Sequence, residues 1–395
     1  MGVGDGGSAA WAASGVAGLT GRADGPPLSP GIATLDAIGA LVADAPVADP
    51  WALLGERAAL AGLARHGSTS CGGATRLLPV DDGWLAVSLT RPEDLAALPA
   101  WLEVGVEVEA VDPWALLDRS LPTRDAEDLV ERAALLGLPV ARLGEAAGSG
   151  PPVVRHRRGP RSALRTSPLV LDLSSLWAGP LCSHLLALEG ARVVKVESVT
   201  RPDGARADTT GFFDLLNHGK AAVALDLRSA EGVGRLRDLL AQADVVIEAS
   251  RPRALQQLGI DAEAFLAAPD GPRVWLSLTG HGRGGPGGDR VAFGDDAAVA
   301  GGLVVVDARG PCFLADAVAD PLTGIVAASA VRRALTDGGA WRLDIALARV
   351  AASVAGSDPT GWPTEGPVAP PRARPAPGQA PALGADTAAI LGELT

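Results

Sequence analysis

Short apolar runs alternate with helical stretches through the second half of this chain, and this alternation restricts the fold more than any other feature. Strands that alternate with helices need crossover connections, which make the strands parallel and cover both faces of the sheet. The pattern predicts an α/β fold with a large Rossmann-like parallel sheet, in which ligands bind at the carboxyl ends of the strands. The predicted strands occupy residues 168–173, 191–196, 221–225, 244–249 and 273–278, and the predicted helices 180–189, 230–241 and 320–335.

The first half of the chain has a different pattern. Residues 50–143 are mostly helical in periodicity, with one strand-like run at 84–89. The Gly-, Pro- and Arg-rich stretch 145–167 has no apolar periodicity and is predicted to be a linker. We therefore expect four parts, which are an N-terminal segment (1–45), a smaller, mostly helical α/β domain (46–150), the large Rossmann-like domain (151–360) and a C-terminal tail that returns to it (361–395).

Composition excludes several classes of protein. The net charge of −12 argues against a nucleic-acid partner, which selects basic surfaces. Three cysteines without a CxxC pair argue against a disulfide framework or a zinc ribbon. The start lacks the basic and apolar regions of a signal peptide, and no apolar run approaches the roughly 20 residues that span a bilayer. We expect a cytoplasmic protein with no membrane contact.

Seven short motifs follow one another in the second half. They are LDLSSLWAGP (171–180), VKVE with DGAR (194–206), LNHGKAAVALDL (216–227), DVVIEASRP (244–252), SLTGHGRGGP (277–286), DAVADPLTG (316–324) and WRLDIA (341–346). In this order they resemble the class III (CaiB/BaiF) acyl-CoA transferase family. The resemblance implies an acyl-CoA:carboxylate CoA-transferase that uses CoA as a substrate carrier, without a metal or a redox cofactor. It also implies an interlocked homodimer whose substrates are an acyl-CoA and a carboxylic acid.

The resemblance implies a role for particular residues. Asp320 corresponds to the carboxylate nucleophile, which attacks the thioester carbonyl and forms a mixed anhydride. Spacing alone favours Asp320 as the cap of a helix that starts with Pro321, whereas the resemblance favours the catalytic role, and Asp316 is a loop acid. The positions that match CoA-binding residues of the family are Ser174, Trp177, Ala178, Arg206, Asn217, Lys220 and Arg251, with Arg206, Lys220 and Arg251 as the phosphate partners. Without the resemblance, Trp177 is explained as core and each arginine as solvated surface.

The order of the segments departs from the family. Residues 14–39 resemble the segment around the catalytic aspartate a second time, with Asp36 in its place, so Asp36 is the alternative nucleophile. Residues 50–145 resemble the small domain that normally follows that aspartate. This rearranged, partly duplicated order keeps open a catalytically silent partner subunit that only binds CoA. An α-methylacyl-CoA racemase is disfavoured, because the family's racemases carry a His where this chain has VAFGDD (291–296), with Phe293 or a neighbour in its place.

Overall fold

The computed structural model describes residues 4–105, 111–159, 165–250, 252–285 and 287–393. Its centre is a seven-stranded sheet with the strand order β5-β13-β10-β9-β6-β7-β8. All neighbouring strands run parallel except β5, which pairs with β13 in the antiparallel direction. The strands are β5 (Val153–Gly159), β6 (Leu169–Asp172), β7 (Arg192–Ser198), β8 (Ala221–Leu225), β9 (Val245–Glu248), β10 (Val274–Thr279) and β13 (Ala340–Ala346).

The strand order reverses direction at β6. From β6 the chain builds outward through β7 and β8, then crosses back to place β9, β10 and β13 on the other side. In open parallel sheets such a reversal leaves a crevice at the carboxyl ends of the two central strands. The loops that follow β6 and β9 are therefore the expected ligand-binding edge.

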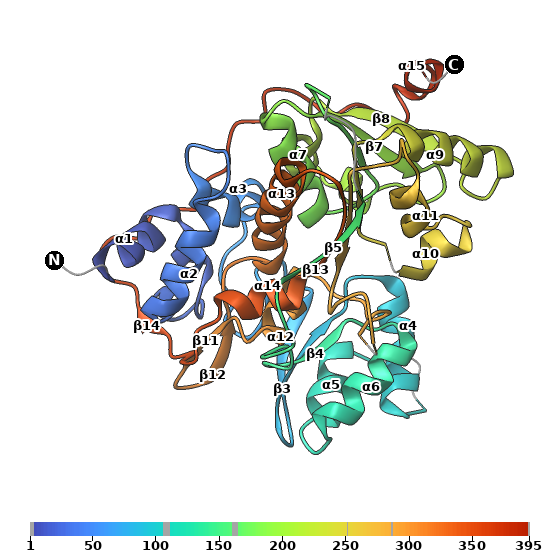
Figure 1. Cartoon of the computed structure of the whole chain (residues 1–395). Helices are drawn as coiled ribbons and strands as arrows, with labels where there is room; N and C mark the ends of the chain where they lie inside the picture. The colour runs from blue at the N-terminus through green and yellow to red at the C-terminus, as the bar shows by residue number, and fades with distance from the viewer. Residues whose placement is uncertain (1–3, 106–110, 160–164, 251, 286, 394–395) are drawn as a thin grey trace.

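Each face of the sheet is covered by its own layer of helices (Figure 1). The first layer shares a core with Val170, and the second shares a core with Leu171, because successive side chains of β6 point to opposite faces. The first layer contains α7 (Ala178–Leu188), α12 (Gly294–Ala300), α13 (Ala319–Asp337) and α14 (Leu347–Val354), and the second contains α9 (Ala230–Gln242) and α11 (Ala262–Ala267). Further helices are α8 (Phe212–Asn217), α10 (Pro252–Gln257) and α15 (Thr387–Gly392).

A smaller unit precedes the large sheet in the chain. It has a three-stranded antiparallel sheet and a core of its own around Leu85, Trp101 and Leu117. Only the strand near residue 84 is predicted from the sequence, so the two strands beside it are additions. The elements are β2 (Thr75–Val80), β3 (Gly83–Ser88), α4 (Pro92–Leu102), α5 (Pro113–Ser120), α6 (Ala126–Leu136) and β4 (Val140–Arg142).

The N-terminal segment and the C-terminal tail pack together on one side of the molecule (Figure 1). Strand β1 pairs with β14, and helix α2 packs against α13. The tail then runs across the molecule, and α15 closes the core beside β8. The elements of these two segments are α1 (Gly4–Ser14), β1 (Leu28–Ser29), α2 (Ile32–Val42) and β14 (Trp362–Pro363). Helix α3 (Glu56–Ala61) follows α2 in the chain, and the hairpin β11 (Val304–Asp307) with β12 (Gly310–Phe313) lies between α12 and α13 in the chain.

The α/β prediction is confirmed, and each predicted strand forms in the sheet. The predicted linker is wrong in part, because residues 153–159 form the edge strand β5. Its arginines are compatible with a strand because an edge keeps one side open to water. Arg155 and Arg157 lie 4.4 and 5.8 Å from the ring centre of Trp341 on the neighbouring strand.

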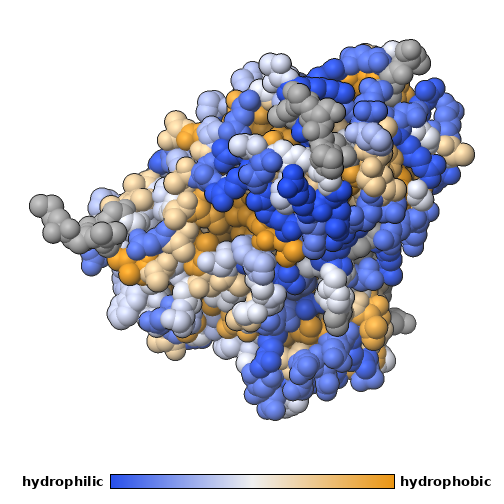
Figure 2. Space-filling view, in the orientation of Figure 1, coloured by the Kyte–Doolittle hydropathy of each residue, from blue (hydrophilic) through white to orange (hydrophobic). Residues whose placement is uncertain are grey.

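Apolar surface gathers between α2 and α13 in the space-filling view (Figure 2). A groove of about 360 Å³ lies there, lined by side chains that include Leu41, Val153 and Ile325, with Asp44 and Arg333 also in its lining. Among the described residues, no helix has the length and apolar character needed to cross a membrane.

Candidate active site

Asp320 lies in the first turn of α13, directly after a strained turn. Ala315 and Ala317 have φ angles of 59° and 44°, a left-handed conformation that costs an alanine of order 1–3 kcal/mol. Asp316 lies between them, and the N–H of Asp320 donates to the carbonyl of Ala317 at 2.9 Å. Such strain persists only where surrounding contacts enforce it. This turn therefore fixes the backbone position of Asp320, from which its side chain extends.

Gly294 lies directly against the side chain of Asp320. Its backbone N–H, at the start of α12, hydrogen-bonds to the Asp320 carboxyl. A Cβ at this position would lie 2.5 Å from Asp320 Oδ2 and 2.3 Å from the carbonyl oxygen of Ala317. Only glycine fits such a close approach of backbone to side chain.

Two more carboxyl groups lie beside Asp320. Asp295, from α12, is buried and accepts a 2.9 Å hydrogen bond from the N–H of Ala317. Asp316 is fully buried and accepts two hydrogen bonds from the guanidinium of Arg57, at 2.8 and 2.6 Å. Among the described residues, Arg57 is the cation paired with this cluster of Asp295, Asp316 and Asp320, which we call the acid cluster.

The surplus of negative charge changes the acidity of the cluster. Burial raises the pKa of Asp320 to about 7, and the charges of Asp295 and Asp316 act in the same direction, against the opposing effect of Arg57. Burial and the Asp316 charge also raise the pKa of Asp295 to about 6. At neutral pH Asp320 is thus divided between the acid and the carboxylate, and the carboxylate is a stronger base than an ordinary aspartate.

The acid cluster adjoins the turn between β6 and α7. The Arg57 guanidinium lies 5.5 Å from the ring centre of Trp177, which is buried and directly precedes the first residue of α7. Gly324, one turn after Asp320, lets α13 cross α7 closely, since a Cβ there would meet the carbonyl oxygen of Ala178 at 2.8 Å. The structure therefore brings the predicted residues Trp177 and Ala178 to the predicted nucleophile. The spacing of Asp320 and Gly324 within the motif DAVADPLTG therefore has a physical reason in this helix crossing.

Cys71 also faces the cluster, but its chemistry is suppressed. Its thiol is buried beside the carbonyl groups of Leu19 and Ala315. Burial and the charges of Asp316 and Asp295 raise the pKa of this thiol far above its ordinary value. The nucleophilic form is the thiolate, so Cys71 has a packing role here.

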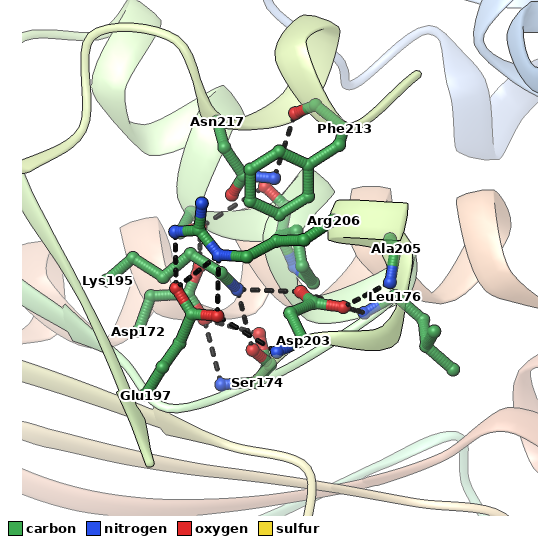
Figure 3. A network of polar contacts seen from close by, with 12 residues as sticks. Asp172, Ser174, Leu176, Lys195, Glu197, Asp203, Ala205, Arg206, Phe213 and Asn217 are labelled. Carbon is green, nitrogen blue, oxygen red and sulfur yellow. Dashed lines mark hydrogen bonds and ion pairs between the residues drawn. The ribbon is translucent and has the colours of Figure 1, made fainter. Parts of the chain in front are cut away.

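Four other predicted CoA-binding residues lie in a second group of polar and charged side chains at the ends of β6 and β7, shown in Figure 3; they are Ser174, Arg206, Asn217 and Lys220. We call it the paired network, because its three acids and three bases form three ion pairs. The pairs join Lys220 to Asp172 at 3.1 Å, Lys195 to Asp203 at 2.9 Å and Arg206 to Glu197 at 2.6 Å.

Lys220 is enclosed by this network. Its buried ammonium donates to Asp172, the carbonyl of Pro180, Ser183 and Asn217, at 2.8–3.1 Å. Asn217 and Ser174 belong to the same network, because Ser174 donates its backbone N–H to Asp172 at 3.0 Å. In this structure Lys220 holds together the loops around the strand ends and does not face solvent, where a phosphate would bind.

Arg206 is engaged in a similar way but lies nearer the surface. It grips Glu197 with two nitrogens and donates to the carbonyl of Pro381 in the C-terminal tail at 3.0 Å. Arg251 lies outside the described residues. The alternative nucleophile Asp36 is exposed on α2, whose opposite face is buried through Leu35 and Ile38, and it takes no part in the acid cluster.

Arg57 and Asp295 are functional candidates that the sequence-based prediction lacks. The one sequence feature at Asp295 is its place in an Asp-Asp pair directly before the apolar run AAVA. Arg57 gives no such signal, since it meets Asp316 from 259 positions away. No group of three or more potential metal ligands occurs in the part of the chain that the structure describes.

Comparison with known proteins adds a family to this geometry. The sequence profile of CoA-transferase family III matches residues 168–385, more than half of the chain. A succinate–glutarate CoA-transferase of Agrobacterium fabrum is 31% identical over 221 residues, which are 50% of this chain and 54% of that protein. An alpha-methylacyl-CoA racemase of Mus musculus is 36% identical over 117 residues, 29% of this chain and 28% of the racemase.

A solved CAIB/BAIF family protein from Brucella suis is 29% identical to this chain. The match covers 49% of this chain and 56% of that structure, with a TM-score of 0.44. The chain spans about half the length of the curated relatives it matches.

Proposed function

This chain belongs to CoA-transferase family III, and on that premise we propose that it moves CoA between an acyl-CoA and a free carboxylic acid. The observation that carries the proposal is the placement of Asp320. The residue is neither fully buried nor exposed, its carboxyl has a raised pKa of about 7, and a strained turn holds it beside the turn between β6 and α7.

The proposed chemistry begins at Asp320. Its carboxylate attacks the thioester carbonyl, and the C–S bond breaks. CoA leaves as the thiolate, and the acyl group stays on Asp320 as an aspartyl-acyl mixed anhydride. Attack of the thiolate on the aspartyl carbonyl then releases the donor acid and leaves CoA on Asp320 as a thioester. The carboxylate of the acceptor acid reverses these two steps and departs as the new acyl-CoA, which restores Asp320.

The raised pKa serves this cycle in two ways. First, a carboxylate with a higher pKa is a better nucleophile than one with an ordinary pKa. Second, the surrounding negative charges of Asp295 and Asp316 oppose a resting carboxylate, and acylation removes that charge. The acid cluster therefore destabilises the free nucleophile relative to its acylated form.

We place CoA along the turn after β6, with Ser174, Trp177 and Ala178 closest to it, because this turn adjoins Asp320. In this proposal Lys220 and Asn217 support the turn from beneath, and Arg206, nearer the surface, is a phosphate partner. By the family resemblance Arg251 is the other phosphate partner. The family resemblance further suggests an interlocked homodimer and a cytoplasmic location.

A racemase is the second candidate, and one observation favours it. Asp295 comes from the stretch VAFGDD, where the family's racemases have a His, and its carboxyl lies in the same cluster as Asp320. Two carboxyl groups with raised pKa values could remove and return the α-proton of an acyl-CoA. Solvent deuterium would then enter the α-position without any acceptor acid.

Mass spectrometry of the intact chain with a panel of acyl-CoAs tests the proposal. We expect hydroxylamine to convert an activated Asp320 to its hydroxamate, and no such product in Asp320→Asn. A hydroxamate on Asp36, or none with any acyl-CoA, contradicts the assignment. If CoA binds but neither product nor α-deuterium appears, the chain is the silent CoA-binding partner subunit.

A further inference from the structure

The turn before Asp320 is held from several directions at once. The N–H of Ala315 donates to Thr20 Oγ1 at 3.0 Å, and the N–H of Ala317 donates to Asp295 at 2.9 Å. The residue between these two strained alanines is Asp316, whose side chain has no exposure to solvent. Whatever binds the Asp316 carboxylate therefore holds the middle of the turn.

Arg57 provides that hold. Its Nε and Nη2 donate to the two carboxylate oxygens of Asp316 at 2.8 and 2.6 Å, which fixes both distance and orientation. A guanidinium can grip a carboxylate in this way because its donors form a rigid planar fork, whereas an ammonium cannot. The ring of Trp177 lies 5.5 Å away and supports the guanidinium on another side.

Arg57 is itself anchored through helix α3. It lies in the first turn of α3, and its neighbour Glu56 is fully buried and paired with Arg374 of the C-terminal tail at 2.6 Å. The guanidinium of Arg57 thus has little freedom to follow Asp316 if the turn moves. Arg57 therefore holds Asp316, and with it the strained turn, in one position.

We propose that Arg57 is a positioning residue for Asp320, and that its two-bond grip on Asp316 holds the strained turn that presents the nucleophile. The inference rests on the proposed function, since Asp320 is taken as the group that is acylated. The charged groups that face Asp320 are Asp295 from α12, Asp316 from the turn and Arg57 from α3. Arg57 acts on Asp320 through position and, more weakly, through its charge.

Two measurements separate these effects. The first is the single-turnover rate at which acyl-CoA acylates Asp320, followed as the hydroxamate across pH. The second is the ¹³C NMR titration of the Asp320 carboxyl in aspartate-labelled protein without CoA, assigned with Asp320→Asn. The variants are Arg57→Gln, Arg57→Lys and the double variant Arg57→Gln/Asp316→Asn, with Arg309→Gln as the control. Arg309 forms the same kind of two-bond pair with Asp24, at 2.8 and 2.7 Å, but on the surface.

We expect Arg57→Gln to acylate at least tenfold more slowly and to titrate Asp320 at a higher pH, because a cation is lost. Arg57→Lys should bring the titration back toward that of the natural protein while acylation stays slow. The double variant decides the mechanism, since it removes both charges of the Arg57–Asp316 pair and leaves neither member of that pair behind without its partner. It should titrate Asp320 close to the natural midpoint and still acylate at least tenfold more slowly.

A natural acylation rate in the double variant or in Arg57→Lys overturns the positioning role. If Arg57→Gln does not fold, as judged by circular dichroism, these two variants decide the question. Should the natural protein form no hydroxamate with any acyl-CoA, the proposed function fails. The titration then tests Arg57 by itself, and an unchanged Asp320 midpoint in Arg57→Lys and Arg57→Gln would remove any link between Arg57 and Asp320.

Discussion

Two groups of charged side chains lie on either side of the turn between β6 and α7, and they differ in charge balance. The paired network joins three acids to three bases. The acid cluster has three carboxyl groups, and among the described residues Arg57 is the cation paired with it. Balance has a measurable consequence for acidity. Burial alone would raise the pKa of Asp172, but Lys220 and Lys195 hold this pKa below its ordinary value. The pKa of Asp320, in contrast, rises to about 7.

The difference separates structural charge from reactive charge. A buried carboxylate with a close cation is stabilised as an ion and is a poor nucleophile or base. A carboxyl in a negative surrounding is poised to lose its charge, which acylation accomplishes. Both groups adjoin the turn between β6 and α7. The paired network supports this turn, and the reactive carboxyl of the acid cluster lies beside it.

The largest effect is expected at Asp320. Asp320→Asn should lower CoA transfer by at least about 10³-fold, roughly 4 kcal/mol at 1.36 kcal/mol per tenfold change, because the amide cannot form the anhydride. Asp36→Asn should keep the natural rate. A rate assay together with urea unfolding is the measurement, and stability should be retained because a raised-pKa carboxyl is replaced by a neutral group of the same shape. Transfer activity in Asp320→Asn would break the distinction between the two groups.

Lys220→Met should show the opposite behaviour, with its main effect on stability. It leaves Asp172 buried without its closest cation, and breaking a buried ion pair in this way costs about 3–5 kcal/mol. Urea unfolding measures the loss, and the double variant Lys220→Met/Asp172→Asn should recover part of it. If Lys220→Met unfolds at the natural urea concentration but binds CoA poorly, Lys220 is a phosphate ligand and the network is not structural.

Gly294→Ala tests the close packing of the acid cluster. The added methyl would meet Asp320 Oδ2 and the carbonyl of Ala317, so we expect Asp320 to be displaced and acylation to slow by about 10²-fold. Gly234→Ala in the middle of α9 is the matched control, because nothing lies within 4 Å of its new methyl. That substitution should stabilise the helix by about 1 kcal/mol and leave the rate unchanged. Equal rates in both variants would show that Asp320 has room to move.

The smallest effect concerns the pH dependence of stability. Asp296 is buried, its Oδ2 has no hydrogen-bond partner in the described structure, and burial raises its pKa to about 7. A carboxyl with a folded pKa above the unfolded value contributes stability below about pH 4 that is lost as pH rises to about 7. Asp296→Asn should therefore reduce the fall in stability between pH 5 and pH 8 by on the order of 1–2 kcal/mol. Urea unfolding at the two pH values measures it, and an unchanged slope would contradict the raised pKa.

The sequence predicts those parallel strands that are local apolar runs, whereas β13, which carries Arg342 and Asp344, is not among the predicted strands. It predicts Asp320 because the family motif around it is also local. The edge strand β5 is missed, since the arginines that suit an open edge also suit a linker. The three-stranded sheet of the small unit is missed in part, because β4 is a short strand between helical patterns.

The balance of charge is the part that sequence cannot supply. Lys220 and Arg206 look like phosphate ligands because their motifs place them at strand ends, but which acid each one meets depends on contacts across 48 and 9 positions. Arg57 and Asp316 meet across 259 positions, and neither carries a motif for the other. Only the folded chain shows which acids have a cation and which do not.

The C-terminal tail has a consequence for how the chain is made. Arg374 reaches Glu56 across 318 positions, next to Arg57, and Asp386 donates its N–H to Ala222 in β8 at 2.9 Å. During synthesis on the ribosome, Glu56 emerges long before Arg374 does. Glu56 therefore has no partner in the early nascent chain, and α3 next to the acid cluster is completed only after Arg374 has left the exit tunnel. Nascent chains arrested before that point should fold the large sheet yet remain sensitive to protease around α3.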